Sequence, residues 1–540
     1  MYTKYDHRSG GMRRRTFLRG LGSVGVFASV PRLLSVHNAY AQDGRDGGMV
    51  RGDRFGRLFP HLPPFAVTHS EREAASLKAA LLELGQPGGM LDARDNLAAG
   101  PVALIADPDL STNNPNNSTH TAGTTFMGQF LDHDMTFDLN SRLAVPTAPE
   151  RSRNTRTPSL DLDSVYGAGP TGNPELYEDT GSAKQFKIES GGLFEDLPRT
   201  SRGQAIIADP RNDENLMIAS LHAAFLLFHN NAVELIASDD PRKSPGEVFD
   251  SARQLTRWHY QWLILHEILP LFIGQALVDD ILRRGRRFYR PDVAFMPVEF
   301  QGAAYRFGHS MVRPSYRANL KGDNDEAFFG MIFDPKGNGQ KDPVDLRGGA
   351  RAPRRFIGWQ TFFNFGSTFT DPDGITPAIR ANKLIDTKIS TPLFHLPLGA
   401  IPGEEKRPVS LPQRNLLRHV TWQLPSGQSV ARHMGVRPLS AADLRELRDI
   451  GRDLDESTPL WYYILKEAQV MAGGTHLGPV GGRIVGEVFI GLLQLSRRSF
   501  LSVSPHWRPT LPTRSGRVTG DYRMVDFLTF AGVDPESRGQ

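Results

Sequence analysis

The sequence predicts a mainly α-helical protein, built as a single large domain with little β structure. Three observations lead to this prediction: apolar residues recur at helical spacing in several long stretches, strand patterns are scarce, and long loops contain Pro and Gly. The composition is that of an ordinary globular chain, with 540 residues, 39% hydrophobic and 23% charged. That length suits one elaborated domain or two.

The expected helices follow one another along the chain. Residues 67–85 have helical periodicity, with Ser70 as the N-cap and a glycine at the end. A loop rich in Asn, Ser and Thr is expected at 109–123, before a helix from about Thr124 to Phe137. The remaining expected helices lie at 213–238, 245–274, 440–451 and 481–496.

The first 41 residues have the features of an export signal. They hold a net charge of +6, and "RRRTFLRG" precedes an apolar run and the small residues Ala39 and Ala41, which suit cleavage after Ala41. The paired arginines resemble a twin-arginine signal, so we expect the twin-arginine export machinery to carry the protein to the periplasm or outside the cell. Residues 42–60 are expected to be a flexible linker, and 61–535 the folded domain.

Composition also excludes several classes of protein. The chain has no cysteine, which excludes disulfides, thiolate zinc sites, iron–sulfur clusters and cysteine nucleophiles. Since residues 1–41 carry more positive charge than the whole chain, the rest is slightly acidic, and nothing indicates nucleic-acid binding. We find no run of eighteen uncharged apolar residues after the signal, so no integral membrane segment is expected in the mature protein.

The stretch "MGQFLDHDMTFD", residues 127–138, combines core residues with unexpected polar ones. On a helix, Gln129 and His133 share a face, Asp132 flanks that face, and Asp134 points to another side. Buried carboxylates are costly unless they are paired, which indicates a partner inside the protein. A neutral imidazole there suits proton transfer to and from a substrate. The alternative is a core histidine hydrogen-bonded by a neighbouring acid.

Two further clusters carry chemistry. In "RTPSLDLDSVYG" (156–167), Thr157, Ser159, Asp161 and Asp163 alternate and offer oxygen ligands to a hard cation, although a polar turn facing water is the alternative. In "ADPRNDENLMIASLH", an arginine, Arg211, stands just before a helix, with Glu214 expected in its first turn. A fixed guanidinium beside an imidazole can stabilise negative charge that develops during proton transfer, whereas an acid at a helix start is also explained by the helix dipole.

The segment "AGTTFMGQFLDHDMTFD" resembles the distal helix of animal-type haem peroxidases, the peroxidase–cyclooxygenase superfamily that includes myeloperoxidase and many bacterial relatives. Gln, Asp, His and Asp recur at the family's relative positions, and further motifs follow in the family's order over residues 60–530. The resemblance implies a bacterial, myeloperoxidase-like member with one large haem-peroxidase domain of animal type.

The resemblance also assigns roles. His133, Arg211 and Gln129 match the residues that act on hydrogen peroxide; His309, in "AYRFGHSMVRP", matches the ligand of the haem iron, with Asn415 as its hydrogen-bond partner. It implies two cofactors, haem b and calcium. The other matches are Asp132 and Glu214 as ester links to the haem, Arg306 and Arg418 as partners of its propionates, and Asp134, Thr157, Ser159, Asp161 and Asp163 as calcium ligands.

Two departures from myeloperoxidase stand out: Asp163 replaces a serine, and Asn215 replaces the methionine that forms a sulfonium link, so efficient chloride oxidation is not expected. The expected function is a secreted haem peroxidase that reduces hydrogen peroxide, oxidises halide, thiocyanate or small organic donors, and serves the oxidative stress response. The alternatives are a fatty-acid dioxygenase and an inactive structural relative. Arg306 stands where lipid oxygenases carry a tyrosine, three residues before the proximal histidine, and Tyr305 is one place off, which favours a peroxidase.

Overall fold

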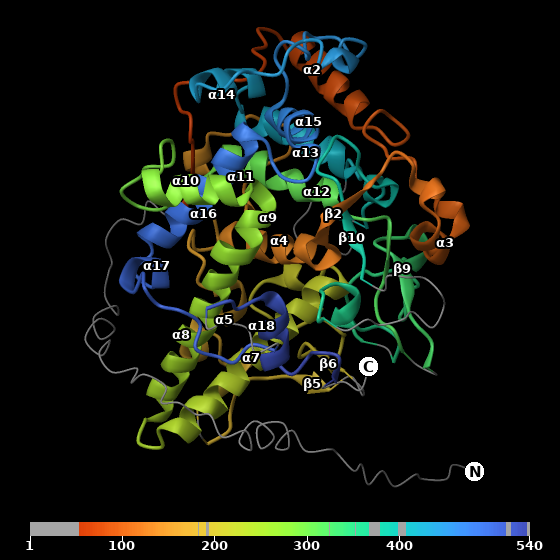
Figure 1. The fold of residues 1–540 in the computed structure, drawn as a ribbon. Coiled ribbons are helices and arrows are strands. Elements are labelled where there is room, and N and C mark those ends of the chain that lie inside the picture. The colour runs from red at the N-terminus through yellow and green to blue at the C-terminus, as the bar shows by residue number, and fades with distance from the viewer. Residues whose placement is uncertain are drawn as a thin grey trace. The chain divides into compact units, whose positions relative to one another are not determined.

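Helices form the core of the computed structural model (Figure 1). The structure describes residues 53–181, 183–190, 194–322, 325–351, 353–366, 379–397, 407–514 and 520–536. The predicted signal peptide, residues 1–41, lies outside the described residues, as does the first part of the predicted linker. Within the described chain, strands are short and pair only two at a time, so the prediction of a mainly α fold with little β structure is confirmed.

The helix α4 (Ala122–Met135) lies near the middle, between α12 (Gly308–Met311) and α7 (Leu216–Asp239), and packs against both (Figure 1). The contact between α4 and α7 includes a stacked ring pair, Phe130 and Phe225, with centroids 4.5 Å apart. Such a pair contributes roughly 0.5–1.5 kcal/mol beyond its buried area. Because α4 is covered on two sides, any polar group on it faces protein or an internal space.

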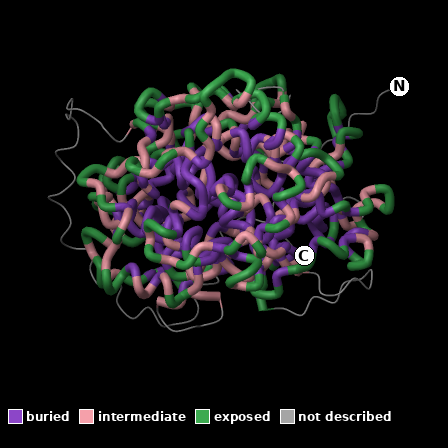
Figure 2. Tube along the Cα trace, turned by 90° about the horizontal axis from the view of Figure 1, so that it is seen from above, coloured by how far each residue is buried: buried purple, intermediate pink, exposed green. Residues whose placement is uncertain are grey.

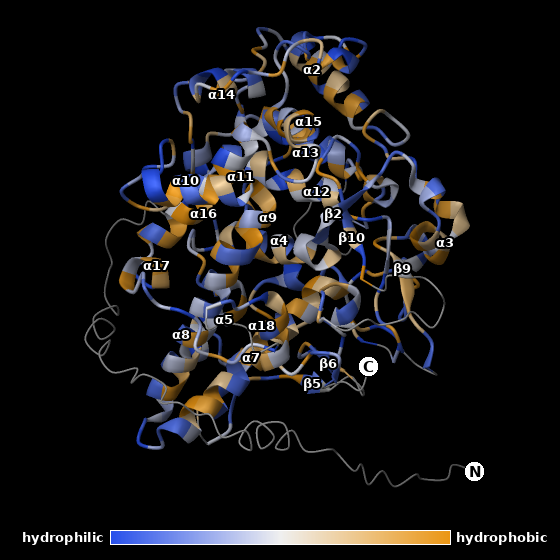
Figure 3. Ribbon diagram, viewed as in Figure 1, coloured by the Kyte–Doolittle hydropathy of each residue, from blue (hydrophilic) through white to orange (hydrophobic). Residues whose placement is uncertain are grey.

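The other helices surround this centre. Figure 2 shows that buried residues occupy the interior and exposed residues the periphery, and Figure 3 shows that α16 is largely hydrophobic. Their bounds are α2 Glu71–Leu84, α3 Pro101–Ala106, α5 Asp163–Tyr166, α6 Gly169–Gly172, α8 Pro245–Leu263, α9 Leu269–Ile273, α10 Gln275–Arg284, α11 Val298–Gly302, α13 Leu411–Trp422, α14 Gly427–His433, α15 Leu460–Ala472, α16 Pro479–Leu495, α17 Phe500–Val503 and α18 Met524–Phe530.

The described strands form five two-stranded sheets. The sheet of β1 with β7 is parallel, and the pairs β2–β10, β3–β4, β5–β6 and β8–β9 are antiparallel. The register of β2 with β10 shifts between Ala381 and Asn382. The strands are β1 Phe55–Gly56, β2 Asn116–Thr121, β3 Tyr177–Asp179, β4 Lys184–Phe186, β5 Glu189–Ser190, β6 Glu195–Asp196, β7 Met296–Pro297, β8 Ser315–Arg317, β9 Phe329–Met331 and β10 Ala381–Lys383.

Local sequence signals place several helices well. The predicted helix at 67–85 is α2: the side chain of Ser70 accepts a hydrogen bond from the backbone of Glu73, and Gly85 follows the last turn. The predicted helix at 245–274 is interrupted. A single π-helical turn, Ile264–Ile268, separates α8 from α9, which contains Pro270. Because proline lacks an N–H group, the regular hydrogen-bond ladder cannot run through it.

Two predicted segments are corrected. Residues 440–451 form turns around a short 3₁₀ helix, Arg445–Leu447, rather than an α-helix. The N–H and hydroxyl groups of Ser440 donate to the Asp443 carboxylate, an arrangement typical of a helix start, but only the short 3₁₀ helix follows it. The predicted loop at 109–123 contains β2, because pairing with β10, distant in sequence, outweighs its weak strand propensity.

The prediction that residues 42–60 form a flexible linker is wrong for residues 53–60, the part that the structure describes. Phe55 lies in β1 and pairs with Met296, and the backbone N–H groups of Leu58 and Phe59 donate to the buried Glu299 carboxylate at 2.8 and 3.1 Å. Tertiary pairing orders this Gly- and Arg-rich stretch despite its composition. The folded unit therefore begins before residue 61, and Val50–Gln540 form one compact unit.

Among the described residues, one helix, α7, is long and apolar enough to cross a membrane by length and composition. If the bent helix pair at 245–284 is treated as one span, there are at most two such candidates. Most of α7 is buried inside the protein (83% of its most apolar window), as is usual for the central helix of a globular core.

Candidate functional site

The polar face of α4 meets the segment that leads into α7. Gln129 donates through Nε2 to Oε2 of Glu214 at 3.1 Å, and its Oε1 accepts from Nδ2 of Asn215 at 3.2 Å. His133, one turn along on the same face, places Nε2 4.0 Å from Oε2 of Glu214. Gln129 and His133 on α4 therefore border one site together with Glu214, which is distant from them in the sequence.

Arg211 is held rigidly beside this helix. Its guanidinium donates to the carboxylate of Asp209 and, at 3.1 Å, to the carbonyl of His133, and it lies 4.1 Å from the centre of the Phe137 ring. Burial alone lowers the pKa of Arg211, but the charge and hydrogen bonds of Asp209, together with the charges of Asp132 and Glu214, outweigh this effect and raise it. The guanidinium is therefore a permanent positive charge next to His133.

His133 is neutral at physiological pH. Burial, followed by the positive charge of Arg211, lowers the pKa of its imidazole to about 3. Its Nδ1 lies 2.9 Å from Oδ1 of Asn212, an atom that only accepts hydrogen bonds. The proton of the neutral ring therefore stands on Nδ1, and Nε2 is free to accept a proton.

Two carboxyl groups border the same site. Burial raises the pKa of Glu214 to about 7, although Arg211 opposes the shift, and burial also raises the pKa of Asp132. The side chain of Asp132 is nevertheless 37% exposed, so it borders open space inside the fold rather than tightly packed atoms. Two carboxyl groups whose ionised forms are disfavoured by burial fit residues that form neutral esters with a bound group.

The position of Glu214 differs from the prediction. It does not stand in the first turn of α7 but between the 3₁₀ turn Pro210–Asp213 and the helix, whose N-cap is Asn215. The side chain of Asn215 accepts from the backbone of Ile218 and so supplies the cap. The carbonyl of Glu214 accepts from the backbone of Gly348, a tertiary contact that local sequence does not indicate.

His309 and Asn415 form the second half of the site. His309 lies in α12, which packs against α4, and its Nδ1 is 2.8 Å from Nδ2 of Asn415 on α13. The Oδ1 atom of Asn415 accepts from Arg306 at 3.2 Å. Ligation of iron through Nε2 of His309 needs the reverse polarity, with Nδ1–H donating to Oδ1. A half-turn of the amide would provide it but would break the hydrogen bond from Arg306.

Arginines gather beside this pair. Burial, followed by the positive charge of Arg418, lowers the pKa of both Arg306 and Arg414 to about 10. Arg418 donates to the carboxylate of Asp138 at 3.3 Å and to the hydroxyl of Ser141. Three guanidinium groups that repel one another fit a dianionic ligand such as the two propionates of haem, because such a ligand removes the repulsion.

Three acids meet on the opposite side of α4. Carboxylate oxygens of Asp134, Asp161 and Asp163 lie within 4.8 Å of one another. Asp134 is fully buried and accepts from the hydroxyl of Tyr260 and the backbone of Leu162, each at 3.0 Å. Burial and the two neighbouring charges raise the pKa of Asp134 well above its usual range, and burial raises that of Asp163 to about 6.

The loop around these acids offers further oxygen atoms. The backbone N–H of Thr157 donates to Asp163 at 2.7 Å, and the carbonyl of Ser159 accepts from the backbone of Asp161 at 2.9 Å. One buried oxygen each of Asp161 and Asp163 has no hydrogen-bond partner. Three crowded carboxylates with unsatisfied oxygen atoms fit a hard divalent cation such as calcium, which would cancel their repulsion.

Sequence reasoning missed several residues of the site. Asp209 holds Arg211, Asn212 holds His133, and Tyr260 holds Asp134. Tyr305, which the sequence analysis considered only as an oxygenase tyrosine, also contacts the site: its hydroxyl donates to the carbonyl of Gly128 on α4 at 3.1 Å. Proximity to Arg211 in the sequence was a signal for Asp209 and Asn212; for the two tyrosines, only the tertiary structure makes the contact.

Comparison with known proteins is consistent with this geometry. A family model described as animal haem peroxidase matches residues 141–338. The Drosophila melanogaster protein "Dual oxidase" is 31% identical over 109 residues, and the Homo sapiens "Probable oxidoreductase PXDNL" is 30% identical over 214 residues. These matches cover 20% and 37% of this chain but only 7% and 14% of the relatives. "Thyroid peroxidase" of Mus musculus is 23% identical over 193 residues, 31% of this chain and 20% of the relative.

Solved structures show the same fold at low identity. Peroxidase A from Dictyostelium discoideum has a TM-score of 0.56 and 17% identity, covering 83% of this chain and 92% of that one. Fatty acid alpha-dioxygenase from Arabidopsis thaliana has a TM-score of 0.53 and 15% identity, covering 83% and 72%.

The fold and the sequence matches together define a protein of the peroxidase–cyclooxygenase superfamily. Within it, residues 141–338 match the animal haem peroxidase family, and the curated relatives include a thyroid peroxidase. Members of this family bind haem and are normally enzymes.

Proposed function

We propose that this protein is an exported haem peroxidase that reduces hydrogen peroxide and oxidises a halide, thiocyanate or a small organic donor. One observation carries the proposal: a neutral imidazole with a free Nε2, His133, stands beside a guanidinium, Arg211, that is locked to the same helix by a 3.1 Å hydrogen bond. Peroxide cleavage needs a proton acceptor and a fixed positive charge in this relation.

In this proposal the site's residues would hold haem b in named ways. His309 would bind the iron, Asp132 and Glu214 would form ester links, and Arg306 and Arg418 would pair with the propionates. When bound, haem supplies the metal that binds peroxide and the electrons that reduce it. The surplus of positive charge around Arg306 supports this arrangement, because two propionates would balance it.

The residues of this chain then handle the proton and the charge. Nε2 of His133 takes a proton from one peroxide oxygen and returns it to the other, which leaves as water when the oxygen–oxygen bond breaks. Arg211 stabilises the negative charge that develops on the departing oxygen. Gln129, fixed by Glu214 and Asn215, points amide hydrogen atoms toward the same space.

Calcium and export belong to the same proposal. A calcium ion among Asp134, Asp161 and Asp163, with oxygen atoms of Thr157 and Ser159, would fix the helix that carries His133. The twin-arginine-like segment supports export to the periplasm or outside a bacterial cell, with removal of residues 1–41, by a route that accepts folded, cofactor-loaded proteins.

An absorbance spectrum of the full chain, prepared with haem and recorded before and after one equivalent of peroxide, tests the proposal. A haem band that shifts within the mixing time is expected in the parent protein. In His133→Ala the rate of that shift should fall about 10³-fold while haem content stays the same. The exposed His69, changed to alanine, is the matched control. Equal rates in His133→Ala and the parent protein would contradict the mechanism.

A fatty-acid dioxygenase is the second candidate, because a dioxygenase is among the solved structures that share the fold. Two observations favour the peroxidase: Arg306 stands three residues before His309, and the nearby Tyr305 donates its hydroxyl hydrogen to Gly128. Oxygen uptake with linoleate and no added peroxide would support the dioxygenase. Bound haem that responds to neither peroxide nor linoleate would indicate an inactive relative.

A further inference from the structure

A buried chain of hydrogen bonds leads away from His133. Nδ1 of His133 is 2.9 Å from Oδ1 of Asn212, and Nδ2 of Asn212 is 2.9 Å from Nδ1 of His222. The three residues come from α4, the 3₁₀ turn Pro210–Asp213 and α7, and all are buried. Neither histidine pairs with a carboxylate at hydrogen-bond distance through these atoms, so one neutral amide connects the two rings.

The amide of Asn212 gives the chain a direction. Its oxygen only accepts, so Nδ1 of His133 carries a hydrogen and Nε2 carries a lone pair. Its nitrogen only donates, so Nδ1 of His222 carries the lone pair and the proton of that ring stands on Nε2. A half-turn of the amide would reverse both tautomers and leave His133 with a proton on Nε2, where it cannot act as the base.

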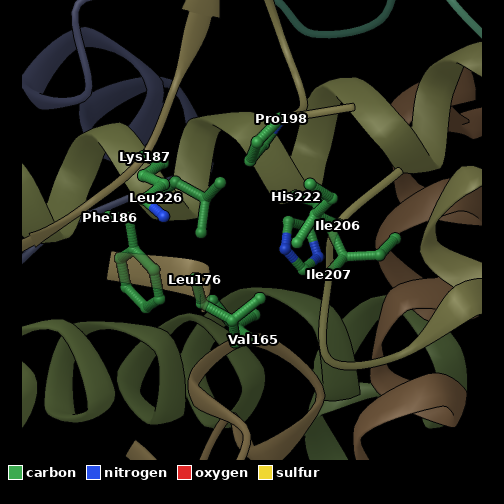
Figure 4. A pocket seen from close by; sticks show the side chains of 9 residues that line it. All are labelled: Val165, Leu176, Phe186, Lys187, Pro198, Ile206, Ile207, His222 and Leu226. Carbon is green, nitrogen blue, oxygen red and sulfur yellow. The ribbon is translucent and has the colours of Figure 1, made fainter. Parts of the chain in front are cut away.

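Asn212 lies in an anchored turn, and His222 ends the hydrogen-bond chain at a cavity. Its backbone N–H donates to the carbonyl of Asp209 at 3.0 Å, in the turn that also anchors Arg211. The far end, His222, borders a small cavity lined mainly by apolar side chains, and Figure 4 shows its imidazole among them. The lining residues of the cavity include Val165, Leu176, Phe186, Ile206 and Leu226.

We propose that Asn212 and His222 are positioning residues that hold His133 in the Nδ1–H tautomer, so that its Nε2 lone pair faces the peroxide. The inference deepens the proposed function and rests on it for the role of His133. One short segment, the turn Pro210–Asp213 with its N-cap Asp209, then fixes both the position of the Arg211 guanidinium and the tautomer of His133.

Neutron diffraction of the full-length, haem-loaded protein in heavy water tests the tautomers directly. The expected result is deuterium on Nδ1 of His133, on Nε2 of His222 and on the Asn212 nitrogen that faces His222. Deuterium on Nε2 of His133, with Asn212 reversed, would overturn the proposal. This readout needs no peroxide reaction, so it judges the inference even if the proposed function fails.

Variants at the far end give a second test. His222→Phe keeps a ring of similar shape but cannot accept from Asn212, whereas His222→Gln restores an acceptor oxygen. At equal haem content, His222→Phe and Asn212→Leu should slow the peroxide reaction about 100-fold, as expected when the base is held in the wrong tautomer. His222→Gln should recover most of the rate, and the KM for the electron donor should stay unchanged in all three variants.

The proposal would be contradicted if His222→Phe reacted with peroxide as fast as the parent protein. It would also be contradicted if His222→Gln reacted as slowly as His222→Phe. If the parent protein itself ignores peroxide, the proposed function fails, and the neutron result alone decides on the tautomers.

Discussion

The side-chain amide of Asn215 donates a hydrogen bond to Oε1 of Gln129 at 3.2 Å. This contact orients Gln129, because an oxygen that accepts from Asn215 leaves the nitrogen end to face Glu214, to which it donates at 3.1 Å. The second hydrogen on that nitrogen remains available to a ligand in the same space. Asn215 therefore does more than cap α7: it decides which end of Gln129 faces the site.

Replacing Asn215 with serine should separate these two roles. Serine retains an N-cap oxygen for α7, so stability should change by less than about 1 kcal/mol, but it cannot reach Gln129. We expect the KM for an anionic donor such as thiocyanate to rise about 3- to 10-fold in steady-state assays, with the rate of the peroxide step within about twofold of the parent. An unchanged KM would show that Gln129 needs no such support.

Asp132 and Glu214 should each contribute one covalent link to haem. After treatment with peroxide, acid–organic extraction should leave haem on the parent protein and release it from the double variant Asp132→Asn, Glu214→Gln. The single variants should each lose one link, detectable by mass spectrometry of haem peptides. Asp213→Asn is the control, since the Asp213 carboxylate pairs with Arg199 at 2.7 Å instead. Retention of haem by the double variant would refute the assignment.

Calcium affinity should depend on pH. The ion requires ionised carboxylates, and without it the pKa of Asp163 is raised to about 6 and that of Asp134 is also raised. Below about pH 6 these groups take up protons, which calcium must displace when it binds. For each displaced proton, the affinity for calcium should fall about tenfold per unit decrease in pH. Calorimetric titration of the calcium-depleted protein from pH 5 to 8 measures this slope.

The variant Asp163→Ser should bind calcium more weakly at pH 8 and show a shallower slope, because one titrating ligand is gone. Asp179→Ser, at an exposed acid outside the cluster, should match the parent. A dissociation constant that does not change with pH would contradict the site.

Glu467 should make the protein less stable as pH rises. Its carboxyl group is buried at the start of α16, where it accepts from the backbone of Val480 and Gly481, and burial raises its pKa to about 7. Between its unfolded pKa near 4.5 and its folded pKa near 7, the folded state holds a proton that the unfolded state lacks. Stability is therefore lost as pH rises through this window, by about 3 kcal/mol from this group.

Glu467→Gln should remove that loss while keeping an oxygen for the same two donors. Denaturant unfolding at pH 5 and pH 8 should show a smaller difference for the variant than for the parent, with the variant the more stable at pH 8. Equal pH dependence in the two proteins would assign the effect to other groups.

Gly348 should tolerate no side chain. A Cβ atom there would lie 1.5 Å from the carbonyl oxygen of Asp213, and the Gly348 backbone donates to Glu214. Gly348→Ala should therefore destabilise the fold by about 3 kcal/mol and reduce ester formation at Glu214, because the loop must move away. Gly246→Ala, where no atom lies within 4 Å of the added carbon, should leave unfolding and haem attachment unchanged.

Local signals were enough for many elements. Ser70 and Gly85 mark the ends of α2, and the spacing of Gln129 and His133 puts them on one face of α4. Patterns failed where distant partners decide: β2 forms because β10 lies beside it, and residues 53–60 are ordered by Glu299 and β7. A stretch with weak propensity takes the structure that its tertiary neighbours provide.

The sequence by itself determined the resemblance to a family, the helical fold and the types of residue in the candidate site, because these depend on short motifs and on periodicity within single segments. Only the tertiary structure decided how these residues are held. Asp209 fixes the guanidinium of Arg211, Asn212 selects the tautomer of His133, and Tyr260 ties down Asp134. Hydrogen-bond direction and burial depend on atoms brought together from distant segments, and no pattern within one segment specifies them.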